Sequence, residues 1–220
     1  MYFIMTSAQK KIQNSSKLRG RPKGSSYPAS PLTISQIKDL YNSCYGKHGH
    51  YLRAFITFGL YSGMRVGTIA RLTVNQAIDA NGKVRDRIIV QADDEKSKST
   101  HTYHLAPNGK RIIQEYVDYL IRDNPLKAND TPLFPSRKSG KCLGPSSASR
   151  MISNLLKKAG IEQNSSHALR KTFATTCYTD LGLGVIELSK LLNHSTVNQT
   201  QNYIMNLQPN ITKALSGMKY

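Results

Sequence analysis

The chain has 220 residues, which is enough for one well-buried domain with a short appendage. Lys and Arg exceed Asp and Glu by 31 to 13, giving a formal net charge of +18, which is typical of proteins that bind a polyanion. The three cysteines are widely spaced and no apolar run reaches membrane-spanning length, which excludes a disulfide scaffold, a Cys-x-x-Cys metal site and a membrane span.

The first 30 residues are rich in basic and small polar side chains, and no acidic residue occurs before Asp39. Such a segment cannot bury enough apolar surface to fold alone, so we expect a flexible basic arm over residues 1–30. Within it, Lys17-Leu-Arg19-Gly-Arg21-Pro-Lys23 resembles the AT-hook, a peptide whose arginines enter the narrow minor groove of A·T-rich DNA. A nonspecific basic tether is the alternative interpretation of these four cations.

Helices dominate the remainder of the chain. Hydroxyl caps at Thr33 and Ser35 begin the first, and apolar side chains at helical spacing predict others across residues 52–60, 113–120, 151–159, 167–177 and 185–192. Asn81-Gly82 indicates a hairpin turn. Short strands are predicted at 87–91 and 100–105, joined by a charged, flexible connection over residues 93–99. The predicted fold class is mainly α with a small antiparallel sheet (α+β).

Four short motifs carry a chemical signal: Tyr61-Ser-Gly-Met-Arg65, His167-Ala-Leu-Arg170, Leu192-Asn-His194, and Tyr203 nine residues after His194. These residue types suit attack on a phosphodiester by a tyrosine hydroxyl. Because tyrosine is a poor nucleophile at its usual pKa of ~10, guanidinium groups must neutralise the phosphate oxygens and histidines must supply hydrogen bonds or proton transfer. Arg65 is unpaired in the sequence, and its turn predicts that it points from a helix N-terminus into a cleft.

The order and spacing of these motifs resemble the tyrosine recombinase (phage integrase) family from about residue 32 to about residue 205. A lysine on a strand pair, in the segment from Glu95 to Leu105, and Leu133-Phe134 in a proline-rich loop complete the resemblance. It implies the integrase catalytic domain fold over residues 31–205. A C-terminal tail over residues 206–220 would then dock on a neighbouring protomer.

The resemblance also implies residue roles. Tyr203 would be the nucleophile that forms a 3′-phosphotyrosyl link, so that rejoining needs neither ATP, a metal nor another cofactor. Arg65 and Arg170 would clamp the phosphate. His167 would accept the tyrosine proton or bind the phosphate, and His194 would hold a phosphate oxygen.

A lysine of the hairpin connection would protonate the leaving 5′ oxygen in this family. Aligning the end of the second strand favours Lys96, and Lys98 remains the alternative. The chain also departs from the family pattern, with Thr68 where an acidic residue usually follows Arg65 by three positions, Lys171 after Arg170, and Asn193 where glycine is commoner. The Thr68 departure leaves open how Arg65 is supported.

The function implied is site-specific DNA recombination, by integration, excision or inversion. The brevity of the segment before the domain resembles the fimbrial DNA invertases. Expected partners are double-stranded DNA and further copies of the chain, as a tetramer on two sites, in the cytoplasm of a bacterial cell or of the host of a mobile element. Two alternatives are a type IB topoisomerase-like relaxing activity and a non-enzymatic DNA-binding regulator with the same fold.

Overall fold

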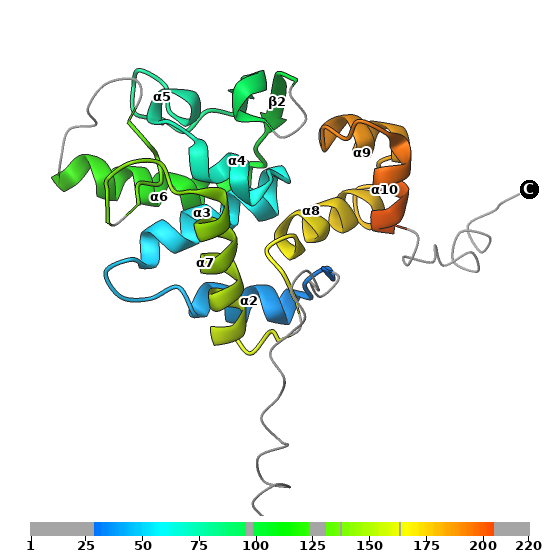
Figure 1. Cartoon of the computed structure of the whole chain (residues 1–220), viewed down its shortest axis with the longest axis horizontal. Helices are drawn as coiled ribbons and strands as arrows, with labels where there is room; N and C mark the ends of the chain where they lie inside the picture. The colour runs from blue at the N-terminus through cyan, green and yellow to red at the C-terminus, as the bar shows by residue number, and fades with distance from the viewer. Residues whose placement is uncertain (1–28, 96–98, 124–130, 137, 163, 205–220) are drawn as a thin grey trace, which may run out of the picture.

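The computed structural model describes residues 29–95, 99–123, 131–136, 138–162 and 164–204. The first 28 residues of the expected arm, Lys96, Lys98 and the expected tail lie outside the described residues. The elements follow in the order α2 (Ile34–Asn42), α3 (Gly49–Ser62), α4 (Val66–Arg71), α5 (Val74–Ala77), β1 (Arg87–Val90), η1 (Ala92–Asp94), β2 (His101–His104), α6 (Pro107–Asp123), α7 (Pro145–Lys158), α8 (Ala168–Thr179), α9 (Val185–Leu191) and α10 (Val197–Ile204) (Figure 1). The predicted fold class, mainly helical with a small antiparallel sheet, is confirmed. Within the described ranges, the helices are too short or too polar to cross a bilayer.

The helix α2 begins where the hydroxyl caps predicted. The Thr33 side chain accepts a hydrogen bond from the backbone N–H of Gln36 at 3.2 Å, and the Gln36 side chain accepts one from the backbone N–H of Thr33 at 3.0 Å. This reciprocal pair satisfies N–H groups that a helix start leaves without partners.

The main core lies around α3, whose apolar stripe packs against α6 and α8. Phe134 joins it from the loop before α7, with its ring 4.9 Å from that of Phe55 and 5.5 Å from that of Tyr116, centroid to centroid. Gly59 allows α8 to approach closely, because a Cβ there would lie 2.8 Å from the Leu169 side chain. The close approach fixes the start of α8 against α3, and α8 carries one of the predicted arginines.

The sheet has two antiparallel strands, in which Ile88 pairs with Tyr103 and both side chains are buried. The predicted turn at Asn81-Gly82 is confirmed, since Gly82 has a φ of +73° and an antiparallel bridge joins Ile78 to Val84 across it. The strands stop at Val90 and His104, within a residue of the predicted ends.

The predicted flexible connection between the strands is wrong for its first three residues. Asp93 and Asp94 lie in the short 3₁₀ turn η1, and Glu95 has an exposed fraction of only 1%. The physical reason is that Arg65 and Arg71, at the two ends of α4, form ion pairs with Glu95 and Asp94. The carboxylates of Asp94 and Glu95, which the sequence predicts in a flexible connection, are therefore held against α4.

A second, smaller core lies among α8, α9 and α10, at one end of the molecule (Figure 1). Its buried members are Ala174, Cys177, Leu188, Leu192 and Ile204. The helix α8 belongs to both cores, because its first residues, Ala168 and Leu169, pack in the main one. The junction between the cores is the place where the predicted site residues can meet.

The turn at Gly63 lies at this junction and is sterically demanding. Gly63 has a φ of +67°, and a Cβ there would lie 2.5 Å from the Phe173 ring. We expect Gly63→Ala to lower the free energy of unfolding by about 1–2 kcal/mol for the left-handed backbone and by about 1–3 kcal/mol more for overpacking, as measured by urea denaturation.

Gly46 is the matched control, since its φ is +77° but a Cβ there would meet no atom within 4 Å. Gly46→Ala should therefore show the backbone cost alone. Equal losses in the two variants would mean that the contact with Phe173 does not constrain the turn.

Candidate active site

A cleft of about 520 Å³ opens between α4, η1, α7 and the start of α8. Its lining includes Arg65, His167 and Arg170, which the sequence predicted as members of one site. Arg71 and Glu95 line it as well. Arg65 is thus brought to one cavity with His167 and Arg170, which follow it by more than a hundred positions in the chain.

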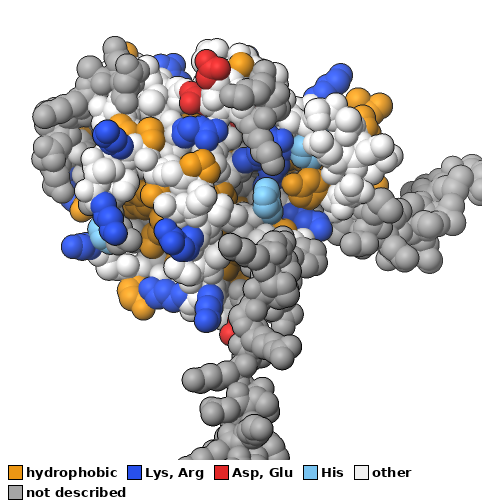
Figure 2. Space-filling view, in the orientation of Figure 1, with side chains coloured by type: hydrophobic (Ala, Val, Ile, Leu, Met, Phe, Trp, Pro, Cys, Tyr) orange, Lys and Arg blue, Asp and Glu red, His pale blue; other side chains and the backbone are white. Residues whose placement is uncertain are grey.

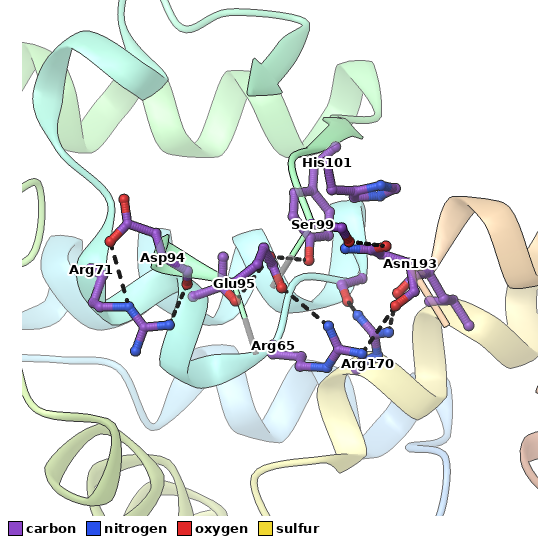
Figure 3. Close-up of polar contacts among 12 residues, drawn as sticks. Arg65, Arg71, Asp94, Glu95, Ser99, His101, Arg170 and Asn193 are labelled. Atoms are coloured by element: carbon purple, nitrogen blue, oxygen red, sulfur yellow. Dashed lines mark hydrogen bonds and ion pairs between the residues drawn. The ribbon is translucent and has the colours of Figure 1, made fainter. Parts of the chain in front are cut away.

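Arg65 is the N-cap residue of α4 and its side chain is 17% exposed. Its Nη1 donates to Oε2 of Glu95 at 3.2 Å, and its Nη2 donates to the backbone oxygen of Asn193 at 3.2 Å (Figure 3). The expectation of an unpaired arginine is therefore wrong. The predicted direction, from the start of a short helix into a cleft, is confirmed.

Glu95 is a residue of the site that the sequence prediction missed. Its carboxylate is fully buried and accepts hydrogen bonds from the Thr68 hydroxyl at 3.2 Å and the Tyr103 hydroxyl at 2.5 Å, besides that from Arg65. Burial raises the pKa of Tyr103, and the hydrogen bond to Glu95 raises it further. The available sequence signal was the acidic residue beside the candidate lysine together with the missing acid at Thr68.

Arg170 is 2% exposed and joins the two cores. Its Nη1 donates to the backbone oxygen of Gly63 at 2.6 Å, and its Nη2 donates to that of Leu192. Burial lowers the pKa of Arg170 and so does neighbouring Arg65, whereas Tyr103 and Tyr203 raise it. The Nε of Arg170 is buried and has no hydrogen-bond partner among the residues that the structure describes.

The turn between α9 and α10 holds His194. Asn193, which precedes His194 in this turn, has a φ of +50°. It is the one residue other than glycine with a positive φ in the described part of the chain. Asparagine tolerates this left-handed conformation, which explains how it stands where glycine is commoner. His194 Nδ1 lies 2.7 Å from the Thr200 hydroxyl, and its ring stacks on that of Tyr203 at 5.3 Å. The spacing of His194 and Tyr203 therefore does bring the two together.

Burial lowers the pKa of His194 to about 3, and the positive charges of Arg170 and Arg65 add to the effect. The ring is therefore neutral at physiological pH. It can serve as a hydrogen-bonding group toward an anion, and it carries no charge of its own into the site.

Three consecutive carbonyl groups at the end of α9 are held by side chains from elsewhere. The oxygen of Leu191 lies 3.2 Å from Nε2 of His101, and Arg170 and Arg65 donate to the next two oxygens (Figure 3). The C-terminal end of a helix carries partial negative charge, which favours the two cationic arginines. The predicted arginines therefore fix the segment that carries His194.

His167 is the N-cap residue of α8 and is exposed in the cleft. A further cleft of about 570 Å³ runs along α7 and includes the basic side chains of Lys138, Arg150 and Lys158. Figure 2 shows Lys and Arg side chains spread over the face that α7 occupies, with few Asp or Glu side chains among them. This face has the charge expected of a surface for a polyanion.

The sequence profile of the phage integrase family matches residues 31–208. This chain belongs to the phage integrase family. It is 27% identical over 175 residues to the tyrosine recombinase XerC of Caldanaerobacter subterraneus subsp. tengcongensis, covering 78% of this chain and 46% of that protein. It is 28% identical over 147 residues to the probable integrase/recombinase YoeC of Bacillus subtilis, covering 67% of this chain and 73% of that protein. The chain thus spans about half the length of the XerC relative.

Solved structures agree with the family assignment. The crystal structure of XerA recombinase matches with a TM-score of 0.66 and 25% identity over 91% of this chain and 68% of that one. The catalytic domain of bacteriophage HP1 integrase matches with a TM-score of 0.57 and 19% identity, over 86% of this chain and 95% of that domain. The fold is that of an integrase catalytic domain.

The low pKa of His194 predicts a pH dependence of stability. The unfolded chain binds a proton at this ring below about pH 6.5, whereas the folded chain does not until about pH 3. Stability should therefore fall as the pH falls through this interval, and His194→Gln should reduce the fall between about pH 7.5 and pH 5. Urea denaturation at several pH values measures it.

Exposed His104 provides the matched control, and His104→Gln should keep the wild-type dependence. A residual fall is expected in His194→Gln, since burial also lowers the pKa of His101. An unchanged fall in the His194 variant would contradict a half-buried, neutral ring.

Proposed function

We propose that this chain is a site-specific DNA recombinase that cleaves and rejoins DNA through a 3′-phosphotyrosyl intermediate. The observation that carries the proposal is the meeting of the two cores at Arg170, a residue of the cleft that donates hydrogen bonds to Gly63 and Leu192. Arg65, His167 and Arg170 line this cleft, and Tyr203 comes from the second core close enough to Arg170 to raise its pKa. A nucleophile and its cationic phosphate site are thereby supplied by separate parts of the fold.

The two arginines act on the scissile phosphate. Each guanidinium has five N–H donors, and the hydrogen bonds from Arg65 to Glu95 and Asn193 use two of them. The remaining donors, and the buried Nε of Arg170, suit the non-bridging oxygens and the charge that builds on them in the transition state. The carbonyl groups of α9 keep both guanidinium groups oriented before DNA arrives.

In the proposed cleavage step, the bonds and protons exchanged all belong to the protein and the DNA. The Tyr203 oxygen forms a bond to phosphorus while the bond to the 5′ oxygen breaks. His167 accepts the tyrosine proton, and a lysine of the connection, Lys96 in preference to Lys98, gives a proton to the 5′ oxygen. The phosphotyrosyl bond retains the energy needed for rejoining. Reversal on a second DNA end then completes the strand transfer.

His194 would donate to the phosphate through Nε2. When the Thr200 hydroxyl donates to Nδ1, the neutral ring carries its proton on Nε2, where it can face an anion. The low pKa keeps this tautomer neutral. Thr200 therefore sets the hydrogen-bonding direction of His194 in this proposal.

Partners follow from the same proposal. XerH site-specific recombinase, a structural neighbour with 19% identity, has been solved bound to difH substrate DNA. We propose double-stranded DNA as the substrate, a tetramer of chains on two sites, the basic arm of residues 1–30 as an additional DNA contact, and residues 206–220 as a segment that docks on a neighbour.

The nucleophile is tested by Tyr203→Phe on a nicked suicide substrate that carries a site selected from a random pool of duplexes. The variant lacks the attacking oxygen, so it should form no covalent adduct while binding DNA as the wild type does. Gel electrophoresis under denaturing conditions measures the adduct. The control is Tyr178→Phe, in the same small core, which should keep the adduct. A 3′-linked adduct in Tyr203→Phe would rule out this nucleophile.

The general acid is tested by comparing Lys96→Ala with Lys98→Ala. Loss of a general acid slows a reaction by ~10²–10⁴, so Lys96→Ala should slow cleavage in that range. A substrate with sulfur at the 5′-bridging position leaves without protonation and should restore much of the rate. Rescue of Lys98→Ala alone would move the role to Lys98.

A further inference from the structure

Glu95 is the one acidic side chain of the cleft that is fully buried among the described residues lining it. Its carboxylate receives three hydrogen bonds, from Arg65, Thr68 and Tyr103. A buried carboxylate is costly unless charge and hydrogen bonds compensate it. The site therefore contains a negative charge that the mechanism proposed above does not use.

The Glu95 carboxylate lies against Arg65, one of the arginines that line the cleft. Arg65 lowers the pKa of Arg170, which means that the two guanidinium groups repel each other. The Glu95 carboxylate touches Arg65 on Nη1, while Nη2 is held by the oxygen of Asn193. Two acceptors in different directions define the plane of the guanidinium group, because its donors form a rigid fork.

The neighbouring ion pair between Arg71 and Asp94 is more exposed to solvent than the pair between Arg65 and Glu95. Its side chains are 31% and 40% exposed, and the Arg71 Nε lies 3.8 Å from Oδ1 of Asp94. Exposed pairs of this geometry contribute little. Two adjacent acids thus each pair with an arginine of α4, and only one of the pairs is buried.

We propose that Glu95 is a positioning residue for Arg65: its buried carboxylate holds the guanidinium in the phosphate-binding orientation and offsets its repulsion from Arg170. The inference rests on the proposed function. Glu95 transfers no proton and touches no DNA in this role. It acts through Arg65, with Thr68 and Tyr103 fixing the carboxylate itself.

The first test is Glu95→Gln, which keeps the shape and removes the charge. At metal sites, loss of a residue that orients a metal ligand costs about 10- to 100-fold in activity. By the same logic we expect a fall of about that size in the rate of adduct formation at saturating DNA. Affinity for DNA should be unchanged or tighter, because the variant has one negative charge fewer. A purely structural role would instead weaken binding and cleavage together. Asp94→Asn, the matched exposed control, should stay within about twofold of the wild type.

The second test moves the carboxylate from position 95 to position 68. The Thr68 hydroxyl lies 3.2 Å from Oε1 of Glu95, so a longer side chain at position 68 reaches the space that a smaller residue at 95 leaves. Thr68→Glu combined with Glu95→Ala should recover at least about tenfold of the activity lost in Glu95→Ala. Thr68→Glu alone should be impaired, since two carboxylates would then share one buried space. Recovery through position 68 also answers the objection that Glu95→Ala merely misfolds.

The outcomes separate the two proposals. Wild-type protein that forms no adduct would overturn the proposed function. An adduct whose rate is the same in Glu95→Gln and wild type would overturn the inference about Glu95 alone. Equal losses of rate and affinity in Glu95→Gln, without recovery in the double variant, would also overturn it.

Discussion

The interaction on which the rest of the structure depends is the pair of hydrogen bonds from the buried Arg170 guanidinium to the backbone oxygens of Gly63 and Leu192. One oxygen belongs to the turn that ends α3 in the main core, and the other to the end of α9 in the second. Removing a guanidinium from water is costly unless its donors find acceptors, and these two oxygens accept from Nη1 and Nη2. The requirement ties the two cores together, and it sets the second core, with Tyr203, beside Arg170, which we propose binds the phosphate together with Arg65.

The closeness of Arg170 to Arg65 also affects the charge state of the neighbouring side chains. Two guanidinium groups in a partly buried space disfavour further positive charge, and they help to keep the His194 ring neutral. They also repel each other, which a buried carboxylate at Glu95 offsets. Because the carbonyl groups at the end of α9 and the carboxylate share the arginine donors, both guanidinium groups are already oriented for the phosphate that we propose they bind. Such preorganised charge lowers the cost of reaching a transition state.

Local patterns in the sequence were sufficient for much of this account. The cap at Thr33, the turn before Arg65, and the interval from His194 to Tyr203 each depend on neighbours in the chain, and each was predicted. The support of Arg65 was not, because Glu95 lies thirty positions away and its burial follows from tertiary pairing with α4. A run such as Asp93-Asp94-Glu95 looks solvated in sequence. Only the fold brings two arginines of α4 to it and buries one of its members.

The central claim is that a phosphate held by Arg65 and Arg170 is attacked from the second core by Tyr203. Mass spectrometry of the covalent complex tests it most directly: the wild-type protein is trapped on a nicked duplex, digested with protease and nuclease, and searched for a peptide that retains a nucleotide. The account predicts the nucleotide on Tyr203, joined through its 3′ phosphate. A nucleotide on another of the twelve tyrosines, on a serine, or joined through a 5′ phosphate would contradict it.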